Sequence, residues 1–233
     1  MTEPKTAMNE LYAAGLESGA DLEFLSRALI VSGDAEHIFL AGKNWKSFDY
    51  NAGLEKLFDS GNNELVHKAG IFWTSFDYDA GMDFLAHRGN ADYIYRAGRF
   101  WPGYNHDFGL ELLGRMKSAK FIYYAGKEWK KFNFTRGFEL LMETDSAEFT
   151  FYAGAYWKEF DFSRGFTKLF SLGVPEYIYR AGTLWRVFDY AAAWRMLEIL
   201  VTSGEEWRGR AFANNRWKPE LIKIWDTLWL EQV

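Results

Sequence analysis

A 28-residue unit recurs six times along the chain without insertion or deletion, and no other feature constrains the fold as strongly. Each copy carries Ala-Gly, then Trp, then an aromatic residue followed by Asp or Asn. The Trp column is Trp45, Trp73, Trp101, Trp129, Trp157 and Trp185. A fixed period of this length is the signature of a solenoid, in which each repeat packs only on its neighbours. The columns that stay fixed are therefore predicted to be structural, and the Trp column is predicted to be core.

Two helices per unit explain the other columns. The first helix is predicted to begin at a capping residue, namely Asp34, Asn62, Asn90, Ser118 or Ser146, with Pro175 as the first helical residue of the sixth copy. The second helix is predicted to be capped by Asp49, Asp77, Asn105, Asn133, Asp161 or Asp189. It ends near Gly61, Gly89 or Gly173, where a left-handed residue is easiest, although other copies have Lys117 and Asp145 there.

The predicted fold is an all-α solenoid of about six helix-pair repeats in one continuous domain, with the repeats at 34–202. Residues 1–33 are predicted to be a degenerate capping repeat, because Ala14-Gly15 stands one residue off register while Leu29 keeps the Leu column. Residues 203–233 abandon the pattern and are predicted to form a C-terminal cap. Its amphipathic helix, which also offers a surface for a homo-oligomer, carries Leu221, Ile222, Trp225, Leu228 and Trp229.

Two structural questions stay open at this point. Segments such as Tyr93-Ile94-Tyr95 are also good strand formers, so a strand-plus-helix horseshoe is an alternative fold. The Ala-Gly column has two interpretations as well. Either Gly42 and its equivalents lie inside a helix beneath the Trp of another element, or they end a shorter helix and leave Trp45 in a loop. A helix-interior Gly costs roughly 1 kcal/mol relative to Ala, so close packing would have to offset that cost.

Composition excludes several kinds of site. The chain has no cysteine, so it has no disulfide and no cysteine-bound metal. Its four histidines form no i, i+4 pair, and no nucleophile-elbow, phosphate-cradling or dinucleotide-binding pattern is present. We therefore expect no metal, no cofactor and no catalytic site. No basic, apolar leader and no apolar run of about 20 residues occurs, so we expect a cytoplasmic protein with no membrane partner.

Columns that vary between copies are the candidates for recognition, because packing does not dictate them. One such column holds Lys68, Arg96, Tyr124, Tyr152 and Arg180, and the column beside it holds Tyr95, Tyr123 and Tyr179. Tyr and Arg are typical of interaction hot spots, so these residues are predicted to bind a protein partner. A Tyr/Arg groove that stacks single-stranded nucleic acid is an alternative, disfavoured by the net charge of −5. Capture of a small ligand such as a nucleotide is another, and simple packing and solvation of the surface is a third.

The unit A-G-x-x-W-x-x-F-D-Y-x-x-G-L-x-x-L resembles short tandem repeats of uncharacterised phage and bacterial proteins, over residues 34–197. More broadly it is similar to the helical-hairpin solenoids, the class of tetratricopeptide and ankyrin repeats, although it matches neither consensus. The resemblance implies a binding scaffold, and a viral protein that engages or inhibits a host factor. It carries over no functional residue.

Overall fold

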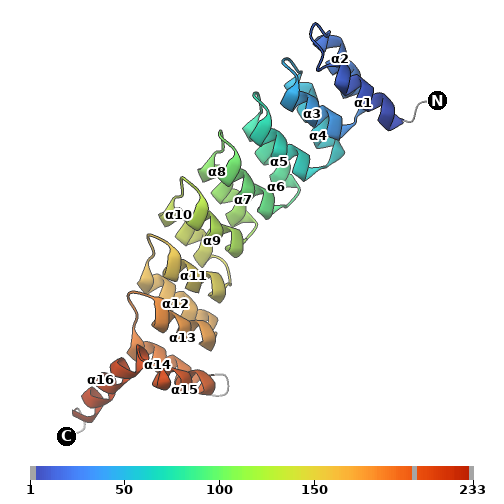
Figure 1. Ribbon diagram of the computed structural model, residues 1–233. Coiled ribbons are helices and arrows are strands. Elements are labelled where there is room, and N and C mark those ends of the chain that lie inside the picture. Colours follow the sequence, from blue (N-terminus) through green and yellow to red (C-terminus); the bar gives the residue numbers. More distant parts are fainter. Residues whose placement is uncertain (1–3, 201–203, 231–233) are drawn as a thin grey trace. The chain divides into compact units, whose positions relative to one another are not determined.

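The computed structural model describes the backbone of residues 4–200 and 204–230 and the side chains of residues 6–200 and 204–225. Those residues form sixteen α-helices and no strand, so the predicted all-α fold is confirmed and the strand-plus-helix alternative is excluded (Figure 1). The chain divides into two compact units, unit 1 (Met1–Leu112) and unit 2 (Leu113–Val233). Within each unit, helix pairs stack as in an α-solenoid of repeats.

Unit 1 begins with one helix pair that precedes the six repeats and continues through the first three of them. Its helices are α1 (Pro4–Ala14), α2 (Leu22–Ser32), α3 (Ala35–Asn44), α4 (Tyr50–Ser60), α5 (Asn63–Phe72), α6 (Tyr78–His87) and α7 (Ala91–Phe100), and the unit boundary falls within α8 (His106–Arg115). The first helices of consecutive repeats contact each other, α3 with α5 and α5 with α7. The two helices of one repeat also contact each other, α3 with α4 and α5 with α6.

Unit 2 holds the last three repeats and the C-terminal helices. These helices are α9 (Ala119–Glu128), α10 (Phe134–Met142), α11 (Ala147–Tyr156), α12 (Phe162–Leu172), α13 (Pro175–Leu184), α14 (Tyr190–Ile199), α15 (Glu205–Ala213) and α16 (Trp217–Leu230). The same arrangement holds here, because α9 contacts α11, α11 contacts α13, and α13 contacts α15. The predicted boundary between residues 202 and 203 lies outside the described residues.

The helix starts are those that the capping residues predict. Asp34 Oδ1 accepts a hydrogen bond from the backbone N of His37 at 3.1 Å, and Asp77 Oδ1 accepts one from the backbone N of Ala80 at 3.0 Å. All six members of the Asp/Asn column accept such a bond at the start of a second helix. Among the first helices, Ser118 makes no side-chain capping bond, and Val174 is followed by Pro175 as the first helical residue.

We expect Asp77→Ala to lower the free energy of unfolding by about 1 kcal/mol, because the first turn of α6 loses the acceptor for the Ala80 N–H. Urea denaturation followed by circular dichroism measures this. Ser118→Ala is the matched control, since that side chain makes no capping bond and its loss is expected to change little. Equal effects of the two substitutions would contradict the capping role.

The ends of the second helices also follow the predicted signal. Gly61, Gly89 and Gly173 have φ values of 68°, 64° and 62°, in the left-handed region that glycine adopts most easily. At the equivalent point after α8, Lys117 takes φ 49°, the one positive φ of a non-glycine residue in the part of the chain that the structure describes. The left-handed conformation therefore persists at Lys117 but not at Asp145, in the copy whose second helix ends earlier, at Met142.

Within each unit, the Ala-Gly glycine of one repeat lies beneath the Trp of the next repeat. In unit 1, Gly42 faces the indole of Trp73 and Gly70 faces that of Trp101; in unit 2, Gly126 faces Trp157 and Gly154 faces Trp185. A side chain at any of these glycines would overlap the indole. Gly42 lies in the last turn of α3, and Trp45 is the first residue after that helix. The prediction that Trp packs over bare backbone is thus confirmed, with the Trp just outside the helix rather than within it.

A hydrogen bond fixes each indole in place. Nε1 of Trp73 donates to the backbone O of Phe39 at 3.1 Å, and Nε1 of Trp185 donates to the backbone O of Phe151 at 2.9 Å. The accepting carbonyl belongs in each case to the residue three positions before the glycine. The rings are buried, as predicted for a core column. One Trp therefore contributes both apolar burial and a directional contact to every joint where it is described.

The same contact continues into both terminal segments, where the sequence pattern fades. Gly15 faces Trp45, whose Nε1 donates to the backbone O of Tyr12 at 3.2 Å. At the other end, Gly182 faces Trp217, whose Nε1 donates to the backbone O of Tyr179 at 3.1 Å. Trp217 stands 32 residues after Trp185 and not 28, so it falls outside the Trp column of the repeats. Residues 204–230 thus keep the joint of the repeat although they lose its sequence.

Candidate binding surface

The residues predicted to bind a partner lie in the second halves of the first helices. Unit 1 holds Lys68 on α5 and Tyr95 and Arg96 on α7. Unit 2 holds Tyr123 and Tyr124 on α9, Tyr152 on α11, and Tyr179 and Arg180 on α13. The structure therefore brings these residues together as two sets, one in each unit.

The Tyr95 column belongs to the core more than to the surface. Tyr95 is 7% exposed and Tyr123 is 5% exposed. Burial raises the pKa of Tyr123 to about 12, so its hydroxyl stays protonated. Tyr179 is half-buried and stacks on Trp217, with ring centroids 6.0 Å apart. Because the next Trp bonds to the carbonyl of this column, the side chains here pack against the following repeat and offer a partner little area.

The basic residues of the neighbouring column are ion-paired within their own helices. Lys68 Nζ lies 2.6 Å from Glu64 Oε1, Arg96 lies 2.7 Å from Asp92 Oδ2, and Arg180 lies 3.2 Å from Glu176 Oε1. All three pairs are spaced i, i+4, a signal that the sequence already contained. Such surface pairs contribute little to stability, but the negative charge of each acid offsets the positive charge of its basic partner.

Exposed apolar residues form a column that the sequence reasoning missed. They occupy the last position of the first helix, directly before the Trp. Phe72 is 46% exposed and Phe100 50% in unit 1, while Tyr156 is 54% and Leu184 50% in unit 2. The signal was the residue before each Trp, which varies as Asn44, Phe72, Phe100, Glu128, Tyr156 and Leu184. Large apolar side chains that remain half-exposed at a repeated position are typical of interaction surfaces.

Cations stand over these exposed rings. Lys43 Nζ lies 4.3 Å from the centroid of Phe72, and the Arg99 guanidinium lies 5.0 Å from that of Phe100. In unit 2, Lys127 Nζ lies 5.5 Å from the centroid of Tyr156. Lys43 and Lys127 come from the repeat before the ring that they cover. We call the exposed and half-buried residues at these helix positions the first-helix face: Lys43, Lys68, Phe72, Arg96, Arg99 and Phe100 in unit 1, and Tyr124, Lys127, Tyr152, Tyr156, Arg180 and Leu184 in unit 2.

The unit 2 part of this face is a cluster of aromatic rings around one guanidinium. Tyr152 lies 5.7 Å from Tyr123 and 6.2 Å from Tyr156, centroid to centroid. The Arg180 guanidinium lies 5.7 Å from the centroids of both Tyr152 and Tyr177. Rings and cations of this kind present a broad, weakly hydrated surface with few rotatable bonds.

His67 replaces an aromatic residue in the buried column, and the structure shows the cost of that exchange. Its ring lies 5.7 Å from Tyr93 and 6.2 Å from both Phe100 and Trp101. Nε2 is buried and has no hydrogen-bond partner among the residues described. Burial lowers the pKa of His67 below its ordinary value of about 6.5, and the positive charge of Arg96 acts in the same direction, against the smaller opposing effects of the Asp92 and Glu64 charges.

We expect stability to fall as the pH falls below about 6.5, because the unfolded chain then binds a proton at His67 that the folded chain resists. His67→Phe restores the residue type of the column and should remove this loss, as well as the cost of an unpaired buried nitrogen, about 1 kcal/mol or more. Urea denaturation of both proteins at pH 5 and pH 7.5 measures the effect. An identical loss in the variant would assign the acid sensitivity to other groups.

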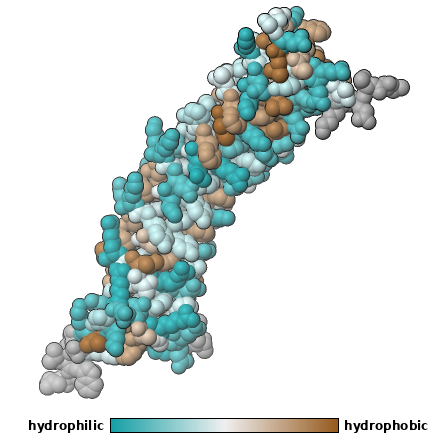
Figure 2. Space-filling model, in the orientation of Figure 1, coloured by the Kyte–Doolittle hydropathy of each residue, from teal (hydrophilic) through white to brown (hydrophobic). Residues whose placement is uncertain are grey.

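Apolar residues are exposed elsewhere in unit 1 as well. Phe24 and Val31 of α2 are mostly exposed, and Figure 2 shows hydrophobic atoms gathering over this end of unit 1. Among the described side chains, no cation lies over Phe24, whereas Phe72, Phe100 and Tyr156 of the first-helix face each have one.

Among the described residues, no three His, Asp or Glu side chains are grouped so that they could hold a metal ion. None of the described helices combines the length and the apolar character that crossing a membrane requires. Comparison of the chain with protein-family models, with curated proteins and with solved structures finds no match.

Proposed function

We propose that this protein is a non-enzymatic repeat scaffold that binds a protein partner through its first-helix face. One observation carries the proposal: half-exposed rings occupy the same position in three of the six repeats, and each of Phe72, Phe100 and Tyr156 lies beneath a cation. Aromatic and Arg side chains of this kind supply most of the binding energy in protein interfaces. The buried Trp and Tyr columns hold the helices that present them.

The charges on the face favour a partner that is apolar with acidic surroundings. Lys43 and Lys127 make no ion pair among the described residues, so each can receive a carboxylate at the edge of an apolar contact. The resemblance to phage repeats supports a host factor as that partner, and the lack of cysteine favours a cytoplasmic location. A second copy of the chain, docking through α16, is a further candidate.

Nucleic acid is a weaker candidate. Binding to phosphates needs unpaired cations, whereas Lys68, Arg96 and Arg180 are paired with acids one turn away. The net charge of −5 opposes such binding too. Tyr124 and Tyr152 nevertheless offer rings on which bases could stack, so the test must separate the two kinds of partner.

The test replaces Phe100, and separately Tyr156, by a photo-crosslinking phenylalanine and exposes the protein to lysate of its native host. The same replacement at Phe24, a still more exposed ring outside the face, is the control. We expect one protein to be crosslinked from both face positions and not from Phe24. With that protein purified, Phe72→Ala/Phe100→Ala should weaken binding at least about tenfold, and Phe24→Ala should not.

Two outcomes would contradict the proposal. Crosslinking from Phe24 alone would place the partner on α2 rather than on the first-helix face. Recovery of a species that nuclease removes, with an affinity that falls steeply as salt rises, would assign the face to nucleic acid.

A further inference from the structure

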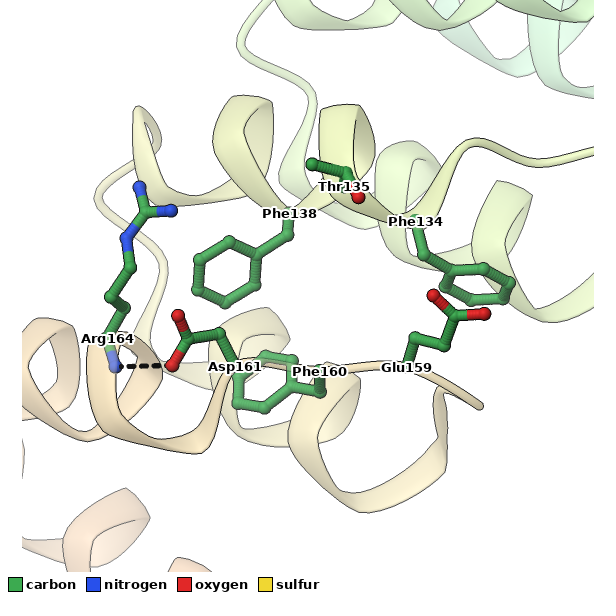
Figure 3. A pocket seen from close by; sticks show the side chains of 7 residues that line it. All are labelled: Phe134, Thr135, Phe138, Glu159, Phe160, Asp161 and Arg164. Carbon is green, nitrogen blue, oxygen red and sulfur yellow. Dashed lines mark hydrogen bonds between the residues drawn. The ribbon is translucent and has the colours of Figure 1, made fainter.

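A cavity of about 340 Å³ opens in unit 2 between the starts of two second helices, and no residue of the first-helix face lines it (Figure 3). Its upper wall is the start of α10, with Phe134, Thr135 and Phe138. Its lower wall is the segment before α12, with Glu159, Phe160 and Asp161, and Arg164 closes one side. The volume is at the lower end of the range of small-molecule sites, about 300–1,000 Å³.

The cavity is lined by aromatic rings. Phe138 is buried and meets Phe160 edge to face, with centroids 5.2 Å apart. Phe134 packs edge to face on Phe132 behind it, so its ring position is set by the core. These contacts fix the three rings before any ligand arrives. The faces of aromatic rings are electron-rich and attract cations, most strongly those that carry little hydration.

Two carboxylates border the same space. Asp161 Oδ1 accepts the backbone N–H of Arg164 at 3.0 Å as the cap of α12, and its carboxylate faces the gap below Phe138 (Figure 3). The Glu159 side chain also lines the cavity, and its carboxylate makes no hydrogen bond or ion pair within the described part of the chain. With Arg164, the lining carries one formal positive and two formal negative charges, a net charge of −1.

Arg164 shows which charge the rings accept. Its guanidinium lies 5.0 Å from the centroid of Phe138. In the view of Figure 3, the Phe138 ring stands between this guanidinium and Glu159. No ion pair holds Arg164 among the residues described. The protein thus places one of its own cations against this aromatic wall, on the side away from the free carboxylate.

A phenylalanine at the position of Phe134 and a carboxylate at the position of Glu159 occur together at one junction between repeats. The position of Glu159 is Ser47, Ser75, Gly103, Lys131 and Val187 in the other copies, so packing does not require a carboxylate there. Where Phe134 stands, two copies of unit 1 have tyrosines. One of them, Tyr50, uses its hydroxyl to bond Thr74 Oγ1 at 2.8 Å across the corresponding gap. Phe134 has no hydroxyl to make such a link, and the gap stays open.

We propose that this cavity binds a small organic cation, specifically a trimethylammonium group held against Phe134, Phe138 and Phe160 with Glu159 and Asp161 as its counter-charges. The site is separate from the proposed protein-binding face. A quaternary ammonium fits this lining better than a primary one, because it is weakly hydrated and needs no hydrogen-bond acceptor at each N–H.

The test titrates the intact protein with choline and, separately, with 3,3-dimethyl-1-butanol, its neutral isostere, and follows backbone amides by NMR. We expect choline to shift the amides of Phe134–Phe138 and Glu159–Arg164 and to bind at least about tenfold more tightly than the alcohol. Equal binding of the two compounds, or no shift at these amides, would overturn the proposal.

Two substitutions make the charge assignment specific. Glu159→Gln should weaken choline binding about tenfold, while Glu143→Gln, an exposed carboxylate beyond the far end of α10, should leave it unchanged. Arg164→Ala should strengthen it, because a competing cation leaves the Phe138 ring. Weaker choline binding in Arg164→Ala would contradict the role of Arg164 as a competing cation at the Phe138 ring. Glu159 and Arg164 are exposed, so neither substitution removes core packing.

Discussion

Trp185→Ala is expected to lower the free energy of unfolding by about 3–5 kcal/mol. The side chain is 0% exposed, covers Gly154 and donates to the carbonyl of Phe151. Its removal leaves a cavity between two repeats and a buried carbonyl without its donor. Urea denaturation followed by circular dichroism measures the loss without relying on Trp fluorescence.

Tyr156→Ala is the matched control for this experiment. Tyr156 is also aromatic and lies next to a Trp in sequence, but it is half-exposed at the end of α11. We expect its loss to change stability by less than about 1 kcal/mol. If Trp185→Ala were as mild, the Trp column would not be the core of the joint, and the division between structural Trp and exposed neighbour would be wrong.

Gly154→Ala is expected to destabilise the protein by about 1–3 kcal/mol, although Ala is the better helix former. A methyl group at this position would lie 2.5 Å from Nε1 of Trp185, a ring that is buried and hydrogen-bonded and so cannot move aside. The cost of overlap should therefore exceed the gain in helix propensity.

Gly209→Ala is expected to change the stability of the protein in the opposite direction to Gly154→Ala, and it serves as the internal reference. Gly209 lies within α15, and a side chain there meets nothing within 4 Å. It should stabilise the protein by up to about 1 kcal/mol, as Ala does in an open helix. Thermal unfolding of the two variants side by side decides the point, and stabilisation by both would show that the glycine column is not required by the Trp.

The sequence predicted the helices well because their signals are local. A cap such as Asp49 bonds to a backbone N–H three residues away, and the left-handed Gly61 ends the helix that Asp49 begins. Trp217 could not be found in this way. Its role depends on reaching Gly182 in space, and four extra residues break the spacing that revealed the others.

The surface was predicted less well than the fold. Tyr95 and Arg96 are neighbours in sequence, yet one is buried and the other exposed, because a helix turns about 100° per residue. Variation between copies marked both columns as candidates without telling them apart. The exposure of Phe72 and Phe100 was not predicted, because each precedes a Trp and two adjacent aromatic residues are typical of a buried core. The cavity near Glu159 depends on how two repeats meet, which no single repeat encodes.

The Trp-over-Gly joint also bears on how a chain like this can change in length. Where a joint is described within a unit, one repeat supplies a glycine to the repeat that follows and a Trp to the one that precedes it, and the two partners, such as Gly42 and Trp73, stand 31 residues apart in sequence. Deletion of one whole repeat, such as 147–174, would bring Gly126 opposite Trp185 at the same spacing of 31 residues, and duplication of a whole repeat would likewise keep that spacing at each joint. Lengths that differ by whole repeats are then neighbours in evolution, while an insertion of any other size within a first helix moves a Trp off its glycine.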